Sequence, residues 1–370
     1  MDALLIGTGG DRGWPEENCS CASCLRAAAA GVRREPGKVV VDGQLVLAPG
    51  APPRPASGSS AHRVLEVPGG WDITRPDGGR LLAAAGPGAV PEPPDGAAGF
   101  DIALLDLLAS PAQLGLLRAR GLVTGQARVA ALYTDHRISS EQEMGRRCAL
   151  WGATAGQDGQ VIGVREPTAE PPSAARPHRT LILGGARSGK SREAELRLLG
   201  EPSVTYLAAG PWADDQWEGA DGEPDTEWAD RVAAHRAARP AWWRTEESLD
   251  VAGVLRRETG ALLIDGIGTW LAGVMDQAGA WPDDAAAWAP PAAADPQHLI
   301  SARIDELIEA WRQTRALVVA VTDEVGSGLV PPYPAGRMFR DQLGWLNQRL
   351  AGESDVSVLV VAGRPVILPA

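Results

Sequence analysis

The stretch Gly184-Gly185-Ala186-Arg187-Ser188-Gly189-Lys190-Ser191 decides the fold of the C-terminal half of this 370-residue chain. It matches the pattern G-x-x-x-x-G-K-[ST], which forms a phosphate-binding loop between a strand and a helix. An apolar run at 180–183 precedes the stretch, and a helix-forming run at 192–199 follows it. The sequence therefore predicts a P-loop, and a glycine-rich turn without function is the weaker alternative.

This loop predicts a site for a magnesium nucleotide. Its backbone N–H groups would turn inward around phosphate oxygens, Lys190 would reach the β- and γ-phosphates, and the Ser191 hydroxyl would ligate Mg²⁺. A phosphate-bound Mg²⁺ usually needs a carboxylate from a neighbouring strand end as well. Asp265 follows the apolar run 261–264 and is the candidate, the alternative being a turn or N-cap aspartate.

Apolar runs alternate with helical patterns throughout the C-terminal half. The strands expected there are 180–183, 204–207, 261–264, 316–321 and 356–361. Such alternation predicts an α/β fold of the RecA-like P-loop kind, a mostly parallel sheet with helices on both faces.

The N-terminal half shows short apolar runs separated by Gly and Pro, a pattern typical of strands. These runs are 3–6, 39–41, 45–47 and 102–105, whereas 48–60 is rich in Pro, Gly and Ser and predicts a loop. The composition changes again at 165–172, a polar and Pro-rich stretch without periodicity, which is typical of a linker. We therefore expect one domain at 1–165, a linker at 166–178 and a second domain at 179–370.

Charge and hydropathy restrict the partners. The formal net charge of −12 argues against nucleic acid as the main partner, because no excess of Lys and Arg neutralises phosphates. No apolar run reaches the roughly 20 residues of a membrane span. The N-terminus lacks the basic and apolar regions of a secretory signal, so we expect a cytoplasmic protein.

A lone histidine lies among arginines at Arg231, His235 and Arg239. On a helix this spacing of four places the three side chains on one face, which would suit a polyphosphate. The arginines would also disfavour the imidazolium and keep a nucleophilic neutral nitrogen. Spacing alone equally allows an ordinary surface histidine.

With these motifs in place, the C-terminal half resembles the bifunctional adenosylcobinamide kinase/adenosylcobinamide-phosphate guanylyltransferase family of cobalamin biosynthesis. The resemblance spans 179–369 and includes several separate motifs in the family's order. Besides the P-loop and the His235 run these are Tyr206-Leu207-Ala208-Ala209, Glu324-Val325-Gly326-Ser327-Gly328-Leu329-Val330-Pro331, Phe339-Arg340-Asp341 and Asn347-Gln348-Arg349-Leu350.

The resemblance implies two reactions. ATP or GTP first phosphorylates the aminopropanol hydroxyl of adenosylcobinamide, with Lys190 taking part. GTP then transfers GMP to the product through a guanylylated histidine, which falls on His235. The nucleotide contacts that carry over are Gly184, Gly185, Ala186, Arg187, Ser188, Gly189, Lys190, Ser191, Ala208, Ala209, Gly210, Arg236, Ala237, Ala238, Arg239, Glu247 and Asp265. The family also implies a homotrimer.

The chain departs from the family at two points that bear on the chemistry. Some relatives carry two adjacent histidines where this sequence has Ala234-His235, so His235 is the remaining candidate. Asp323 stands where the family usually has Asn. Two alternatives stay open: a P-loop kinase without guanylyltransferase activity, and a binding protein that nucleotide turnover regulates.

Three cysteines cluster near the N-terminus, at Cys19, Cys21 and Cys24. In a reducing compartment such spacing more often indicates a metal site than disulfides, and three packed free thiols are the alternative. With Gly7-Thr8-Gly9-Gly10 before it, the cluster resembles the opening of a metallo-β-lactamase-fold phosphodiesterase subgroup. That resemblance implies a structural Zn²⁺, with His136 as the fourth ligand.

The hydrolytic histidines of that fold are missing. An H-x-H-x-D-H cluster occurs nowhere among the five histidines of the chain. His62 stands alone in a Ser- and Ala-rich stretch and predicts an ordinary surface residue. We therefore expect a reduced, non-hydrolytic metallo-β-lactamase-like αβ domain at the N-terminus.

Overall fold

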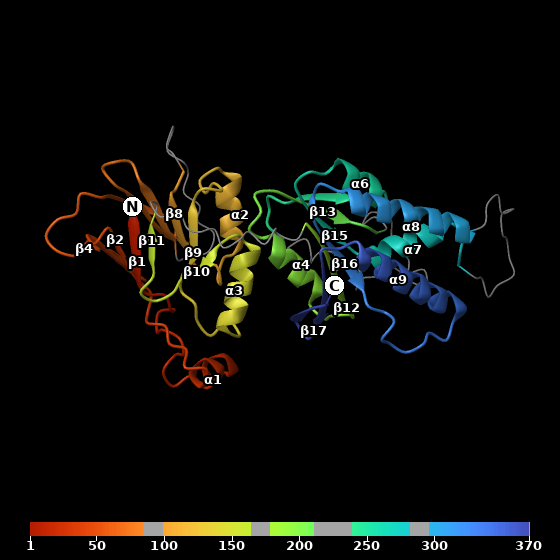
Figure 1. Cartoon of the computed structure of the whole chain (residues 1–370), viewed down its shortest axis with the longest axis horizontal. Helices are drawn as coiled ribbons and strands as arrows, with labels where there is room; N and C mark the ends of the chain where they lie inside the picture. Colours follow the sequence, from red (N-terminus) through yellow and green to blue (C-terminus); the bar gives the residue numbers. More distant parts are fainter. Residues whose placement is uncertain (85–98, 164–177, 211–238, 282–295, 370) are drawn as a thin grey trace, which may run out of the picture. The chain divides into compact units, whose positions relative to one another are not determined.

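The computed structural model describes residues 1–84, 99–163, 178–210, 239–281 and 296–369 (Figure 1). The chain divides into two compact units. The first comprises Met1–Ala174 with Leu199–Pro202, and the second comprises Ala175–Leu198 with Ser203–Ala370. All of the expected linker except His178 lies outside the described residues, so its bounds remain a prediction. Among the described helices, none is long and apolar enough to cross a membrane.

The second unit is built on a seven-stranded sheet of order β14-β13-β15-β16-β12-β17-β18. Neighbouring strands are parallel except β17 and β18, which are antiparallel. The strands are β12 (Arg179–Gly184), β13 (Val204–Ala208), β14 (Arg244–Glu247), β15 (Ala261–Asp265), β16 (Leu317–Asp323), β17 (Val356–Val361) and β18 (Arg364–Ile367).

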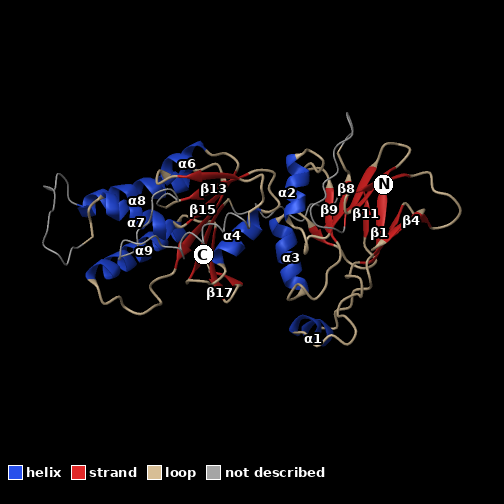
Figure 2. Ribbon diagram, turned by 180° about the vertical axis from the view of Figure 1, so that it is seen from behind, coloured by secondary structure: helices blue, strands red, loops and turns tan. Residues whose placement is uncertain are grey.

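Helices cover both faces of this sheet, which confirms the predicted α/β fold. One apolar core joins alternate strand residues such as Leu181 and Ile264 to residues of α6, α7, α8 and α9. Figures 1 and 2 show α4 on the other side of the sheet from these helices. The helices are α4 (Lys190–Leu198), α6 (Val251–Arg257), α7 (Ile267–Gln277), α8 (Pro296–Gln313) and α9 (Pro334–Gly352).

The two edge strands of this sheet, β14 and β18, were not among the strands predicted from apolar runs. Strand β14 has the sequence Arg-Thr-Glu-Glu, which carries no apolar alternation. Its backbone nevertheless pairs with β13 from Thr205↔Arg244 to Ala208↔Glu247. An edge strand can be polar because its side chains need not be buried on both faces.

The first unit contains two sheets, of order β11-β1-β2-β3-β4 and β10-β9-β8-β7-β6-β5. Apolar residues of both sheets, such as Leu5, Val41, Leu81 and Leu104, form one core between them. The strands are β1 (Asp2–Gly7), β2 (Lys38–Val41), β3 (Leu45–Ala48), β4 (Ala51–Pro55), β5 (Arg63–Val67), β6 (Gly70–Thr74), β7 (Arg80–Ala84), β8 (Ile102–Leu105), β9 (Arg128–Ala131), β10 (Thr154–Ala155) and β11 (Val161–Gly163).

Among the described residues of this unit, three helices accompany the sheets: α1 (Ala22–Ala29), α2 (Ala112–Ala119) and α3 (Glu141–Leu150). Leu114 and Leu117 of α2 are fully buried. The prediction of a loop over 48–60 was wrong in part, because 51–55 forms β4. This strand lies at the edge of its sheet, where proline is tolerated since no partner needs its missing N–H.

Candidate nucleotide and metal sites

The parallel strands of the second unit bring the predicted nucleotide residues to one edge of the sheet. Gly184 at the end of β12 is paired with Asp323 at the end of β16. Ala208 at the end of β13 is paired with Asp265 on one side and with Glu247 on the other. Since the carboxyl ends of parallel strands share an edge, the P-loop, both aspartates and Glu247 lie along it.

Backbone geometry shapes the P-loop. Gly189 has a φ of 95°, a conformation that glycine adopts without strain. A Cβ on Gly184 would lie 2.4 Å from Oγ of Ser188, so a larger residue there would force the Ser188 side chain to move. The N–H of Gly363 donates to the Ser188 carbonyl at 2.8 Å and ties the loop to the β17–β18 turn. Lys190 then begins α4.

The Lys190 ammonium pairs with the aspartate that departs from the family pattern. Its Nζ lies 2.9 Å from Oδ1 of Asp323 and donates to the Gly185 carbonyl at 3.2 Å. A Cβ on Gly268, in the first turn of α7, would lie 3.1 Å from Oδ2 of Asp323. The carboxylate therefore lies between the Lys190 ammonium and the N-terminus of α7.

The end of β16 is held by a buried asparagine of α9. Oγ1 of Thr322 donates to Oδ1 of Asn347 at 2.7 Å, and Nδ2 of Asn347 donates to the Asp323 carbonyl at 3.0 Å. Asn347 is buried. This explains why a polar residue interrupts the apolar face of α9, and it fixes the backbone that carries Asp323.

Ser191 and Asp265 bring together two oxygen atoms that could ligate a metal ion. Oγ of Ser191 donates to Oδ1 of Asp265 at 3.5 Å. The Tyr206 hydroxyl donates to Oδ2 of the same carboxylate. Burial of Tyr206, together with the Asp265 charge, raises the pKa of the phenol far above its usual range, so it remains a donor. A hydroxyl and a carboxylate at this position fit Mg²⁺, a cation that prefers oxygen ligands.

Those of the other expected nucleotide contacts that the structure describes include Ala209, Gly210 and Arg239. The N–H of Ala209 donates to the Asp265 carbonyl at 3.3 Å, and Gly210 packs against Thr269 of α7. The Arg239 guanidinium lies 3.1 Å from the centroid of the Tyr206 ring. Arg231, His235, Arg236, Ala237 and Ala238 lie outside the described residues, so neither their expected helix nor their roles are tested.

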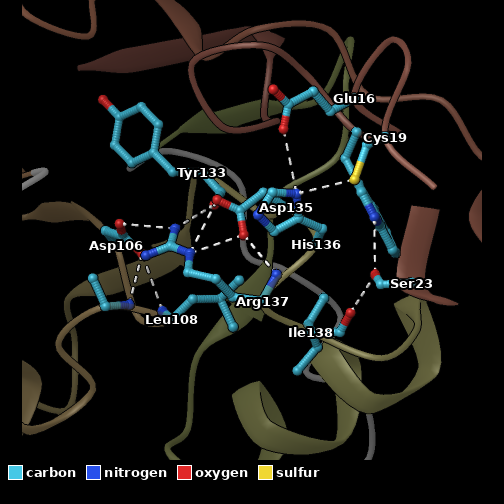
Figure 3. Close-up of polar contacts among 12 residues, drawn as sticks. Glu16, Cys19, Ser23, Asp106, Leu108, Tyr133, Asp135, His136, Arg137 and Ile138 are labelled. Carbon is cyan, nitrogen blue, oxygen red and sulfur yellow. Dashed lines mark hydrogen bonds and ion pairs between the residues drawn. The ribbon is translucent and has the colours of Figure 1, made fainter. Parts of the chain in front are cut away.

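In the first unit the structure gathers Cys19, Cys21, Cys24 and His136. Figure 3 shows Cys19 and His136 of this cluster. One ligand atom from each lies within 4.8 Å of every other, and Sγ of Cys19 lies 3.9 Å from Nδ1 of His136. With Zn–S bonds of about 2.3 Å, tetrahedral sulfur atoms lie about 3.8 Å apart. The four residues therefore fit a Zn²⁺ ion after small side-chain adjustments.

Backbone N–H groups support the sulfurs. The N–H of Cys24 donates to Sγ of Cys21, and the N–H of Glu16 donates to Sγ of Cys24, both at 3.4 Å. The first of these bonds lowers the pKa of Cys21, whereas burial raises the pKa of the Cys24 thiol to about 11. Zn²⁺ binding would therefore release a proton from Cys24.

A cavity of about 370 Å³ adjoins His136. Asp106, Asp135 and Arg137 line it, and burial raises the pKa of Asp106. The Arg137 guanidinium joins the two carboxylates, with Nη2 at 3.2 Å from Asp106 and Nε at 2.8 Å from Asp135 (Figure 3). Among the described residues, Cys19, Cys21, Cys24 and His136 are the one group of three or more His, Cys, Asp or Glu side chains whose ligand atoms lie close enough together to share a metal ion.

The prediction that His62 is an ordinary surface residue was wrong. Its side chain is 3% exposed, and its Nε2 lies 2.8 Å from Oδ2 of Asp42. Its Nδ1 lies 2.7 Å from Oγ of Ser60. The histidine thus joins the β4–β5 loop to the β2–β3 turn, a contact between distant segments that the local sequence could not reveal.

Comparison with known proteins agrees with the nucleotide site. A family model described as cobinamide kinase/cobinamide phosphate guanyltransferase (CobU) matches residues 180–368. The chain belongs to this family. The bifunctional adenosylcobalamin biosynthesis protein CobP of Pseudomonas aeruginosa is 37% identical over 196 residues, which are 51% of this chain and 96% of that protein. CobU of Salmonella typhimurium is 37% identical over 189 residues, 50% of this chain and 95% of that protein.

The matched region of this CobU-family chain lies almost entirely in the second unit. For the first unit, zinc-bound PqqB from Methylobacterium extorquens is a solved structure with 15% sequence identity and a TM-score of 0.28. That match covers 44% of this chain and all of PqqB. A similarity this distant decides neither fold nor function.

Among described residues of the CobU-family unit, sequence reasoning overlooked two contacts of the site. It gave no partner to Lys190 and no role to Tyr206. A signal for the second existed, because a tyrosine inside an otherwise apolar strand needs a hydrogen-bond acceptor for its hydroxyl. The acceptor itself could not be named before the strands were paired.

Proposed function

We propose that the second unit phosphorylates adenosylcobinamide with ATP or GTP and then transfers GMP from GTP to the product, giving adenosylcobinamide-GDP. The P-loop at the sheet edge, with Ser191 and Asp265 side by side, is the observation that carries the proposal. The family match supports the choice of substrates.

In the phosphoryl step, the backbone N–H groups of Gly185 to Ser191 would cradle the phosphates. Lys190 would move from Asp323 to the β- and γ-phosphates and stabilise the charge of the transferring group. Ser191 and Asp265 would hold Mg²⁺, which supplies further charge neutralisation when bound. The substrate hydroxyl oxygen would form the new bond to the γ-phosphorus and lose its proton to solvent, while the bond from the γ-phosphorus to the β-phosphate oxygen breaks and ADP or GDP leaves.

In the guanylyl step, a neutral nitrogen of His235 would attack the α-phosphorus of GTP, and pyrophosphate would leave. A phosphate oxygen of adenosylcobinamide phosphate then attacks the same phosphorus, and the imidazole leaves. Imidazole suits both half-reactions because it is a good nucleophile and a good leaving group. Arg236 and Arg239 would bind the polyphosphate.

Labelling with α-³²P-GTP tests this proposal against its alternatives. The wild type should form a covalent, acid-labile adduct. His235→Asn should form none, yet should still phosphorylate adenosylcobinamide at least in part. Lys190→Ala should lose both reactions by orders of magnitude. A labelled His235→Asn protein would place the adduct elsewhere, and an unlabelled wild type with kinase activity would favour a kinase without guanylyl transfer.

For the first unit we propose a metallo-β-lactamase-like domain without hydrolytic activity. Two facing sheets and the Cys19, Cys21, Cys24, His136 cluster, which would hold one structural Zn²⁺, support this assignment. We also propose a homotrimer, from the family resemblance, and a cytoplasmic location. Both proposed reactions are assigned to residues of the second unit.

A further inference from the structure

We propose that Tyr206 is a positioning residue that orients Asp265 toward Mg²⁺ and Arg239 toward the nucleotide phosphates. The inference deepens the proposed function and rests on its P-loop site. Tyr206 lies in the middle of β13 and is 2% exposed. It does not belong to the P-loop, and the mechanism above gives it no part.

Strand pairing places Tyr206 and Asp265 on the same face of the sheet. Tyr206 is paired with Leu263 of β15, and Asp265 follows two residues later. Residues two apart on a strand share a face. Leu262 and Ile264 point into the core formed with α6, α7, α8 and α9. Tyr206 and Asp265 therefore face the opposite side, where α4 begins with Lys190 and Ser191.

The phenol fixes the orientation of the carboxylate. Its hydroxyl donates to Oδ2 of Asp265, while Oδ1 accepts from Oγ of Ser191 at 3.5 Å. One carboxylate oxygen is thus bound to a buried donor, and the other faces the serine expected to ligate Mg²⁺. A hydrogen bond from a neutral donor to an ion is stronger than one between neutral groups, so it resists rotation of the carboxylate.

The ring of the same tyrosine supports an arginine. The Arg239 guanidinium lies over the ring at 3.1 Å from its centroid. Nε of Arg239 is buried and has no hydrogen-bond partner within the described part of the chain. The ring face is therefore the main contact of this guanidinium among the described residues. A stacked guanidinium keeps its outer N–H groups available for phosphate oxygens.

Equilibrium binding of a non-hydrolysable GTP analogue tests the contact of the Tyr206 hydroxyl with Asp265 and the contact of the Tyr206 ring with Arg239 separately. Tyr206→Phe keeps the ring and removes the hydroxyl. We expect the Mg²⁺ concentration for half-maximal binding to rise about tenfold or more, because a hydrogen bond to a charged group is lost. Binding without Mg²⁺ should stay unchanged. The matched control is Tyr333→Phe, which removes the hydroxyl of an exposed tyrosine and should leave the Mg²⁺ dependence unchanged.

Tyr206→Leu removes the ring as well. Binding in EDTA should then weaken about three- to thirtyfold, the range of a cation–π contact. Arg239→Gln should weaken it by at least as much, and the double variant Tyr206→Leu/Arg239→Gln should bind no worse than Arg239→Gln. In Arg239→Gln, the Mg²⁺ dependence should remain that of the wild type.

If Tyr206→Phe kept the Mg²⁺ dependence of the wild type, the proposed role of the hydroxyl in orienting Asp265 would be wrong. If the losses of binding in Tyr206→Leu and Arg239→Gln were additive in the double variant, the proposed role of the ring in orienting Arg239 would be wrong. Because Tyr206→Phe is nearly isosteric, it keeps the test valid even if Tyr206→Leu does not fold. Lys190→Ala distinguishes this failure from failure of the proposed function: if it binds the analogue as tightly as the wild type, the P-loop assignment itself is wrong.

Discussion

At the scale of single residues, the least expected feature is the carboxylate of Asp323 beside the P-loop lysine. An ammonium that already has an anionic partner must exchange it for phosphate when the nucleotide binds. The Asp323 side chain is 41% exposed and that of Lys190 is 16% exposed, so solvent screens the pair in part. The exchange should therefore cost modest rather than large binding free energy.

We predict that Asp323→Asn, which restores the usual family residue, binds GTP more tightly. Loss of one negative charge near the triphosphate and release of Lys190 should lower the dissociation constant about three- to tenfold. Titration with a fluorescent GTP analogue at fixed Mg²⁺ measures it. Asp341→Asn, in an exposed pair on α9, is the control. Weaker binding of Asp323→Asn would instead show that the carboxylate assists the nucleotide, for example as a metal ligand.

At the scale of elements, the P-loop depends on backbone that an L side chain disfavours. Gly189 has a φ of 95°, and a Cβ there would lie 3.2 Å from Cα of Gly363. Gly189→Ala should strain the loop by about 1–2 kcal/mol and displace its N–H groups from the phosphates. We expect nucleotide binding to weaken by tenfold or more while circular dichroism still shows a folded protein.

Gly344→Ala is the matched control for that variant. Gly344 lies inside α9 with open space around its Cα, so alanine should favour the helix and leave binding unchanged. If Gly189→Ala bound the nucleotide as well as Gly344→Ala does, the loop would not present its backbone to phosphate in the way proposed.

Asp355 links the N-terminal ends of the neighbouring strands β12 and β17. It accepts hydrogen bonds from the N–H groups of His178 and Arg179, and its Oδ1 pairs with the Arg179 guanidinium at 3.0 Å. Burial alone would raise its pKa, but these donors outweigh burial and lower it. A carboxyl whose folded pKa is lowered stabilises the fold above its unfolded value of 3.8 and loses that contribution as pH falls through the folded value.

We therefore predict that Asp355→Asn lowers the unfolding temperature of the second unit at pH 7, and that the difference from the wild type shrinks below about pH 4. Calorimetry across this range measures it. Asp305→Asn, whose carboxylate is 62% exposed, should show little difference at either pH. A deficit of Asp355→Asn that stayed constant down to pH 2 would mean that ionisation of this group does not support the fold.

At the scale of the whole molecule, each unit has its own core and its own candidate site. The described metal cluster belongs to the first unit, and the P-loop belongs to the second. Loss of zinc should therefore destabilise one unit and spare nucleotide binding in the other. A bound metal would supply folding free energy here because the cluster connects α1 to the segment after β9.

We predict about one zinc per chain in the purified protein. Cys21→Ser and His136→Ala should lower that content and the unfolding temperature of the first unit, measured by metal analysis and calorimetry. Both should still bind GTP. Cys148→Ser, which changes the cysteine outside the cluster, should keep its zinc. A zinc-free wild type whose first unit unfolds cooperatively would leave the three cysteines as packing residues.

The sequence by itself determined those features that depend on local order. The P-loop, the alternation of apolar strands with helices and the Cys19-to-Cys24 spacing each need only neighbouring residues. For the same reason the family could be named from motifs in their order along the second unit. The thiolate cluster likewise indicated a metal before its distant fourth candidate was placed beside it.

Tertiary structure alone decided what depends on the pairing of distant segments. Strand register placed Asp323 against Lys190 and Tyr206 against Asp265, and the fold buried His62 between Ser60 and Asp42. Strand β14, with four polar residues, exists because β13 offers a backbone edge to pair with. Hydrogen bonds and ion pairs across a sheet carry no periodic signal along the chain, so no reading of local sequence could reveal them.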